Sequence, residues 1–358
     1  MNSFLFILLY VTCIISVRSQ MMGGKTAGKT DFRYPVQIWS SAYSRKYGDA
    51  DGVERDMIKG AEYICTGVIV DPQRVLTAAH CVHYYKLLNL QMYVVAGDTY
   101  KKETSDNSLH EYRKQVPVFA IFIHEKYKAN VKNSAYDIAM LVLYKNLYHP
   151  DKSTDFINNI LLPKKDGASR KDGDICTTMG WGQTKREKRW VGGKEKIICS
   201  HDSEVLKYTE VKVLPDEACS QHLEKFQPEV QICVGTDEAT RLLKGDSGAP
   251  LVCKNDDGDY RLYGVAQSAE IIYGLNIVVY TRMRGIDWKK WNAFAKVEVK
   301  KKQIEYNRKK REKMNRKRIP TEENYKREQR KENNSKHNEN MKLTLILMGI
   351  VGMMVAFV

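Results

Sequence analysis

Residues 115–123 read Gln-Val-Pro-Val-Phe-Ala-Ile-Phe-Ile, a short apolar run of the kind from which most of this chain is built. Val, Ile and Phe are the residue types enriched in β-strands. Comparable runs recur from about residue 20 to residue 295 and are separated by turn-forming clusters. Further examples are Gly67–Val70, Leu90–Ala96, Ile138–Tyr144, Glu204–Leu214, Arg261–Ala266 and Asn276–Arg282. Many strands with few helices predict an all-β fold, either a sandwich or a barrel.

One helix is expected at the end of this β-rich region. Ile286, Trp288, Trp291, Phe294 and Ala295 fall roughly at helical spacing. Such an apolar stripe predicts a terminal helix that lies against the β-rich domain.

The first residues have the pattern of a signal peptide. Phe4–Val17 is apolar, and the small residues Val17 and Ser19 follow at the spacing of a cleavage site. An uncleaved anchor is the alternative, although the run is short for a membrane span. We therefore expect a secreted or cell-surface protein with four segments: a signal peptide 1–19, a globular domain 20–295, a basic stalk 296–342 that is disordered or helical, and a hydrophobic segment 343–358.

Basic residues are concentrated in the stalk. The formal net charge is +15, and residues 296–342 hold 18 Lys and Arg against 8 Glu, a net +10. A nucleic-acid partner is excluded by the predicted secretion. Anionic glycans or lipid head groups are plausible partners, and a solvated spacer is the alternative.

The hydrophobic segment Leu343–Val358 predicts attachment to a membrane. It has sixteen residues without a charge, and the small or polar residues Asn333-Asn334-Ser335 and a polar spacer precede it. This arrangement is typical of a signal for a glycolipid anchor. A C-terminal membrane helix is the alternative.

Three motifs carry the residue types needed to hydrolyse a peptide bond. They are Thr77-Ala78-Ala79-His80-Cys81, Asp137-Ile138-Ala139-Met140-Leu141 and Gly245-Asp246-Ser247-Gly248-Ala249-Pro250, in the order His, Asp, Ser. Hydrolysis at neutral pH needs a nucleophile, a base, a carboxylate that orients the base, and donors for the oxyanion. Each motif alone is weak evidence, but the three in this order are specific.

These motifs and their order resemble the active-site signatures of the chymotrypsin and trypsin family. The resemblance covers about Met21 to Phe294 and implies two packed antiparallel β-barrels with a C-terminal helix. It implies that His80 is the general base, that Asp137 orients it and that Ser247 is the nucleophile. The N–H groups of Gly245 and Ser247 would form the oxyanion hole. No metal and no cofactor is expected, and the substrates would be proteins or peptides.

The same resemblance implies three disulfides among the seven cysteines that follow the predicted leader. The implied pairs are Cys65–Cys81, Cys176–Cys253 and Cys219–Cys233. Cys199 is left over, either as a free thiol or as a bridge to a partner. Disulfides agree with an oxidising compartment.

The chain departs from the family pattern at the activating N-terminus. Met21-Met22-Gly23-Gly24 stands where the family has a sequence like Ile-Val-Gly-Gly, and Gln20 precedes it in place of a basic residue. The resemblance makes Asp246 the partner of the new N-terminus. The sequence therefore does not determine how the activating N-terminus is produced.

The specificity pocket departs from the pattern as well. Arg241 stands where trypsin-like enzymes keep an aspartate, Gln267-Ser268-Ala269 replaces a Ser-Trp-Gly segment, and Val278 replaces a glycine. Leu243 replaces the first cysteine of the disulfide that flanks the pocket. Like charge and lost volume predict poor cleavage after Lys or Arg, with any activity directed to acidic or small residues.

Two long polar inserts are expected as solvated loops that border the substrate cleft, Tyr43–Ala61 and Lys185–Ser203.

The sequence is compatible with two classes of function. The first is a serine endopeptidase with a specificity unlike that of trypsin. The second is a catalytically impaired homologue that acts as a binding or regulatory module.

Overall fold

The structure is a computed structural model in which only part of the chain is described. For residues 41, 184–191, 194–202, 275, 309–310, 313, 315–318, 322–325 and 345–355 the description is of the backbone alone. The described residues are 24–41, 61–101, 110–149, 154–163, 172–191, 194–236, 242, 244–272, 275–318 and 322–355.

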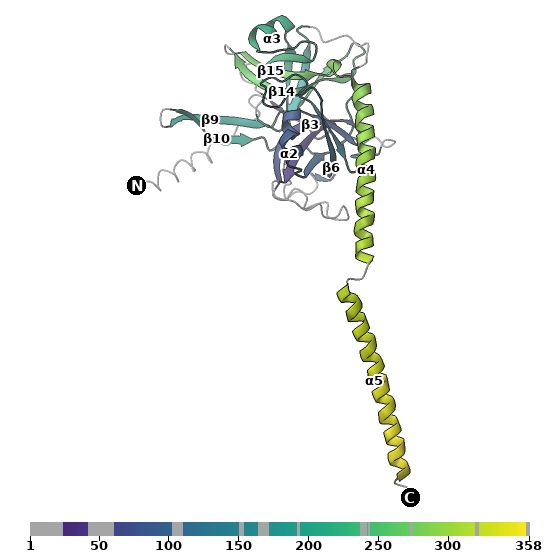
Figure 1. The fold of residues 1–358 in the computed structure, drawn as a ribbon. Helices are drawn as coiled ribbons and strands as arrows, with labels where there is room; N and C mark the ends of the chain where they lie inside the picture. Colours follow the sequence, from purple (N-terminus) through teal and green to yellow (C-terminus); the bar gives the residue numbers. More distant parts are fainter. Residues whose placement is uncertain are drawn as a thin grey trace, which may run out of the picture. The chain divides into compact units, whose positions relative to one another are not determined.

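Six strands close the first barrel (Figure 1). Along β6 every second residue is buried, namely Val116, Val118, Ala120 and Phe122, so the run at 115–123 turns one face to the core. This is the side-chain period of a β-strand. The strands, in hydrogen-bonded order, are β2 (Pro35–Ser41), β3 (Ala61–Asp71), β4 (Arg74–Thr77), β7 (Ala139–Leu143), β6 (Lys114–Ile123) and β5 (Met92–Ala96).

The second barrel is closed because β8 pairs with both β13 and β11. Antiparallel pairing links all its strands, and a short strand β1 (Lys25–Thr26) is added at β11. Closure leaves no free sheet edge within the ring. In ring order the strands are β8 (Ile175–Gly180), β13 (Pro250–Lys254), β14 (Tyr260–Ile272), β15 (Leu275–Arg282), β12 (Gln231–Thr236) and β11 (Lys207–Val213). The prediction of two antiparallel barrels is confirmed.

Three disulfides join described parts of the chain: Cys65–Cys81, Cys176–Cys253 and Cys219–Cys233. They close segments of 16, 77 and 14 residues. Each closure of this kind contributes roughly 2–4 kcal/mol to stability. These are the pairs that the family resemblance implies, while the side chain of Cys199 lies outside the described residues.

Two short helices connect strands, α2 (Ala79–Leu87) and α3 (Asp216–His222), and the 3-10 turn η2 (Met283–Gly285) follows β15. The predicted terminal helix begins as α4 (Trp288–Arg318). Trp291 is buried and meets the ring of His124 edge-on with centroids 5.6 Å apart, and Arg74 donates to Asn292 at 2.5 Å.

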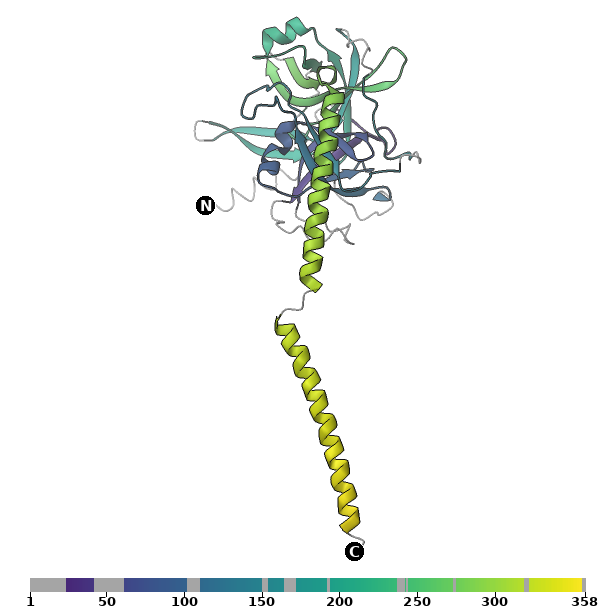
Figure 2. The same ribbon diagram turned by 45° about the vertical axis from the view of Figure 1, so that its right-hand side comes forward.

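The insert Lys185–Ser203, expected as a loop, forms a hairpin instead. Strand β9 (Gln183–Val191) pairs with β10 (Lys194–Asp202) from Val191↔Lys194 to Gln183↔Asp202, and the register shifts twice along the way. Figure 1 and Figure 2 both show this hairpin extending away from the barrels. The insert Tyr43–Ala61 lies outside the described residues except for Ala61, the first residue of β3.

The chain divides into two compact units, Met1–Ala293 and Phe294–Val358. The second unit holds most of α4 and all of α5 (Glu322–Val355). α4 ends at Arg318, two residues before Pro320, and a proline cannot continue a helix. Among the helices of the described residues, none is long and apolar enough to cross a membrane.

Candidate active site

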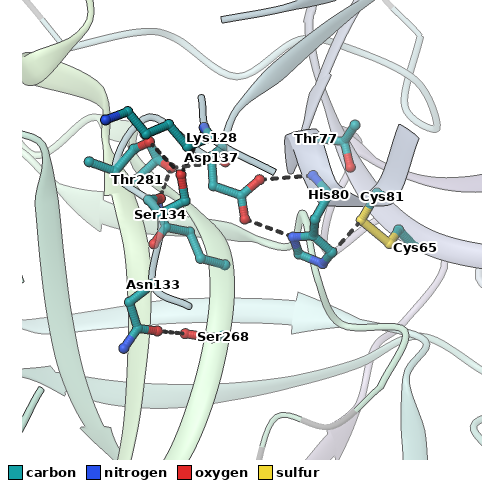
Figure 3. A network of polar contacts seen from close by, with 12 residues as sticks. Cys65, Thr77, His80, Cys81, Lys128, Asn133, Ser134, Asp137, Ser268 and Thr281 are labelled. Atoms are coloured by element: carbon teal, nitrogen blue, oxygen red, sulfur yellow. Dashed lines mark hydrogen bonds and ion pairs between the residues drawn. A yellow bond between two sulfur atoms is a disulfide. The ribbon is translucent and has the colours of Figure 1, made fainter. Parts of the chain in front are cut away.

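His80 and Asp137 form a two-point contact at the edge of the first barrel (Figure 3). The backbone N–H of His80 donates to Asp137 Oδ1 at 2.9 Å, and His80 Nδ1 lies 2.7 Å from Asp137 Oδ2. The Asp137 side chain is 9% exposed, whereas that of His80 is 39% exposed. A buried carboxylate thus fixes one ring nitrogen and leaves the imidazole accessible.

Small residues allow His80 to take this place. It is the second residue of α2, which follows β4 directly through Ala78 and Ala79. Both alanines are fully buried, so the first turn of the helix packs closely against the barrel. The adjacent disulfide Cys65–Cys81 ties α2 to β3.

Asp137 is held by the second barrel as well. Thr281 Oγ1, on β15, donates to the backbone carbonyl of Asp137 at 3.0 Å. Gln267 Nε2 in turn donates to Thr281 Oγ1 at 2.6 Å. The residue before the aspartate, Tyr136, has a φ of 60°, so the chain turns sharply immediately ahead of the carboxylate.

The environment of His80 makes its imidazole a stronger base. Burial lowers its pKa, but the hydrogen bond and the negative charge of Asp137 raise it by more, and the net shift is above 6.5. A neighbouring carboxylate favours the protonated ring in this way. The pair can therefore accept a proton from a nearby group.

Ser247 lies in a tight turn between Lys244 and Ala249, ahead of β13. Gly245 and Gly248 have φ values of 97° and 83°, conformations that favour glycine. At Gly248 a Cβ would also lie 2.1 Å from the carbonyl oxygen of Thr66, so no side chain fits there. The Ser247 carbonyl accepts from the Thr66 N–H of the first barrel at 3.0 Å.

The structure does not join His80 to Ser247 by a hydrogen bond in the described part of the chain. His80 Nε2 lies 3.8 Å from Cys81 Sγ instead. Such contacts are often long before substrate binds. The sulfur atoms beside His80, those of Cys65 and Cys81, are bonded to each other, so they offer no thiolate to a metal ion.

Asp246, the expected partner of a new N-terminus, is 1% exposed. Its Oδ1 accepts from the Gly182 N–H at 2.8 Å. A Cβ at Gly180 or Gly182 would come within 2.4 Å of the carboxylate, so the carboxylate has room only because both residues are glycine. Met21 and Met22 lie outside the described residues, and pairing with an N-terminus stays a prediction.

A pocket of about 170 Å³ opens beside Ser247. Its walls include Ala269 and Val278, which face each other in the register of β14 and β15. Gln267 also lines it, and its amide is engaged with Gln231 and Thr281. Arg241 and Leu243 lie outside the described residues. The complete lining is Leu242, Lys244, Asp246, Ser247, Ala266, Gln267, Ser268, Ala269 and Val278.

A polar bridge beside the pocket was not predicted from the sequence. Asn133, ahead of Asp137, accepts from Ser268 Oγ at 2.9 Å (Figure 3). It also donates to Glu270 at 2.9 Å. Lys132 pairs with the same glutamate at 3.0 Å. Asn133 has a φ of 53°, and asparagine tolerates this conformation better than most residues. No short-range pattern marks this bridge, since its partners come from different barrels.

Comparison with known proteins agrees with this architecture. The family described as Trypsin matches residues 43–289. Serine protease grass of Drosophila melanogaster is 30% identical over 201 residues, which is 53% of this chain and 48% of that protein. Granzyme F of Mus musculus is 28% identical over 61% of this chain and 72% of its own length. Kallikrein 1-related peptidase b3 of Mus musculus is 28% identical over 54% of this chain and 66% of its own.

The chain spans about half of the Drosophila relative and about two thirds of the kallikrein-related one. The family match itself covers well over half of this chain and every strand of the two barrels except β2. The chain belongs to the trypsin-like serine protease family.

Proposed function

We propose that this protein is a serine endopeptidase that hydrolyses peptide bonds through Ser247, His80 and Asp137. The observation that carries the proposal is the two-point contact of His80 with buried Asp137, which hydrogen bonds of Thr281 and Gln267 connect to the pocket that Ser247 lines. Family membership supports the reaction class.

The proposed chemistry starts with attack of Ser247 Oγ on the scissile carbonyl carbon. His80 Nε2 takes the hydroxyl proton as the new C–O bond forms, and Asp137 stabilises the resulting imidazolium. The backbone N–H groups of Gly245 and Ser247 would bind the oxyanion. His80 then returns the proton to the leaving amine as the C–N bond breaks. Water, activated by the same base, hydrolyses the acyl-enzyme. This sequence requires His80 to approach Ser247 when substrate binds.

The pocket supports a preference for small side chains. Val278 and Leu242 narrow it with apolar surface, and Lys244 adds a positive charge to its lining. With Arg241 nearby in the sequence, a substrate Lys or Arg meets like charge, whereas an acidic side chain does not. We expect cleavage after small or acidic residues. Efficient turnover of an arginyl amide would contradict this.

Covalent labelling tests the reaction class. Purified protein is treated with a fluorophosphonate probe, and wild type is compared with Ser247→Ala and with Ser220→Ala, an exposed serine on α3. We expect labelling of wild type and Ser220→Ala but not of Ser247→Ala, with all three equally folded. Peptide hydrolysis should disappear with the label, apart from residual catalysis. Equal labelling of Ser247→Ala and wild type would overturn the assignment.

One observation bears on the alternative, a homologue that binds without catalysis. No hydrogen bond joins His80 to Ser247 within the described residues. A folded wild-type protein that fails to react with the probe and with small-residue substrates would support this alternative.

The three disulfides support an oxidising compartment, and we infer an extracellular or cell-surface location. Residues 1–23 lie outside the described part of the chain. The side chains of residues 345–358 do so too. The signal peptide, the lipid anchor and the binding of an anionic glycan or lipid by the basic stalk therefore stay predictions.

A further inference from the structure

The first barrel holds the loop that carries Ser247 through two hydroxyl groups of β3. Tyr63 Oη donates to the carbonyl oxygen of Gly245 at 2.8 Å, and Thr66 Oγ1 donates to the same oxygen at 3.2 Å. The two hydroxyls are also 2.9 Å apart. The N–H of Thr66 donates to the Ser247 carbonyl, so residues of β3 form hydrogen bonds with both ends of the segment Gly245–Ser247.

The backbone of Gly245 needs these hydrogen bonds to hold it in one conformation. Its φ of 97° is open to glycine, and glycine has more backbone freedom than any other residue. The carbonyl of Gly245 belongs to the peptide unit next to the N–H groups that the proposed mechanism uses. Fixing that carbonyl limits rotation of the loop and hence the direction of the neighbouring N–H groups.

The Tyr63 ring is itself tightly placed. It meets Trp39 edge-on with centroids 5.7 Å apart, and Lys101 Nζ lies 4.3 Å from its centroid. Lys101 is 2% exposed, so this cation–π contact is shielded from water. A Cβ at Gly245 would lie 3.0 Å from Tyr63 Cε1, which shows how closely the loop approaches the ring.

A buried charged cluster fixes Lys101 in turn. Arg113 donates to the carbonyl of Lys101 at 3.2 Å and pairs with Asp98 at 2.7 Å. His110 Nδ1 lies 2.6 Å from the same carboxylate. The Asp98 side chain is fully buried, and those of Arg113 and His110 are 3% and 7% exposed. The contacts therefore run without a break from Asp98 to Gly245.

We propose that Tyr63, whose ring contacts Lys101, is a positioning residue. It holds the segment Gly245–Ser247, which we call the oxyanion loop, in its reactive conformation. This inference rests on the proposed function, because it assigns the loop a role in that reaction. According to this inference, side chains of the first barrel restrain the loop, in addition to any restraint that Asp246 provides. Tyr63 touches neither substrate nor the reacting atoms and acts through Gly245.

The test uses the full-length protein and Tyr63→Phe, which removes one hydroxyl and keeps the ring. The matched control is Tyr148→Phe. Tyr148 is a buried tyrosine of the first barrel's core, and its hydroxyl donates to Asn159 at 2.5 Å, away from the site. We expect kcat of Tyr63→Phe to fall about tenfold, less than the loss of about 10²- to 10³-fold that follows removal of a direct oxyanion donor. KM should be unchanged.

Two further measurements separate positioning from general destabilisation. Phosphonylation of Ser247 should slow in parallel with kcat, whereas methylation of His80 by a small sulfonate ester, which needs no oxyanion hole, should proceed at the wild-type rate. Lys101→Met should cause a smaller loss of kcat that is less than additive with Tyr63→Phe, because both changes act on the same ring.

The loop is also measured directly by amide hydrogen exchange of peptides that contain residues 244–248. We expect faster exchange in Tyr63→Phe and not in Tyr148→Phe. Unchanged exchange, or wild-type kcat in a folded Tyr63→Phe, overturns the inference. Failure of the wild-type protein to react with fluorophosphonate would refute the proposed function instead, and the exchange result would still decide whether Tyr63 orders the loop.

Discussion

Replacing Gly182 by alanine is expected to disable catalysis while the barrels stay folded. The new Cβ would lie 2.4 Å from Cγ and Oδ2 of Asp246 and 2.6 Å from its Oδ1, whereas ordinary contact begins at 3.4 Å. The carboxylate must therefore move by about 1 Å, since close-packed interiors leave no spare volume. Asp246 precedes Ser247 directly, and its carbonyl accepts from the Ala249 N–H at 2.9 Å, so the displacement passes into the turn.

The size of the effect follows from this shift. A misplacement of about 1 Å in an active site costs roughly 10²-fold in rate, and loss of one oxyanion donor costs about 10²- to 10³-fold. We expect kcat to fall within that range, with a smaller change in KM. Overpacking of this kind costs about 1–3 kcal/mol of stability, against the roughly 5–15 kcal/mol typical of a folded protein.

The assay combines kcat for a small-residue peptide substrate, the rate of fluorophosphonate labelling and thermal unfolding. Gly235→Ala is the control, because its Cβ would lie 3.2 Å from Cδ2 of Leu214, the end of a flexible side chain. It should keep the wild-type kcat. A folded Gly182→Ala with wild-type kcat would refute the reasoning that the position of Asp246 determines the geometry at Ser247.

Two other predictions concern the base and the pocket. Burial lowers the pKa of His80 and Asp137 raises it by more, so kcat/KM should fall on the acid side with an apparent pKa above 6.5. Asp137→Asn should move this limb to lower pH and reduce kcat by about 10⁴-fold, and an unmoved limb would contradict the pairing. The same shift means that His80 stabilises the fold fully below pH 6.5 and loses this contribution as pH rises through its folded-state pKa. Val278→Ala should raise kcat/KM for leucyl relative to alanyl substrates by roughly fourfold per additional methylene buried, from about 0.8 kcal/mol each. Val279→Ala, in a different core cluster, should leave this ratio unchanged.

The fold could be predicted from the sequence because strand signals are local. In β6 the buried residues alternate along the run, and in β14 and β15 the predicted segments fall inside longer strands. The hairpin β9–β10 was missed, since its charged residues suggested solvated loop. Gly192-Gly193, between two nine-residue strands, is a turn dipeptide that indicates a hairpin.

The candidate site could be predicted only where a motif carries it. His80, Asp137 and Ser247 stand in specific local contexts. Tyr63 and Asn133 do not, because their roles depend on contacts with residues 182 and 135 positions away in the chain. The size of the pocket likewise depends on the register that brings Ala269 opposite Val278. Non-local packing of this kind leaves no trace in local composition.

The reciprocal hydrogen bonds between the barrels bear on how the protein is made. The first barrel carries His80 and Asp137, the second carries Ser247, and Thr281 of the second reaches back to Asp137. During synthesis the N-terminal barrel emerges first and domains fold largely in that order. A nascent chain in which only the first barrel has folded therefore holds the proposed base without the proposed nucleophile, and Asp137 without the hydrogen bond from Thr281. The proposed catalytic site is therefore complete only after the last strands, β13 to β15, have been synthesised.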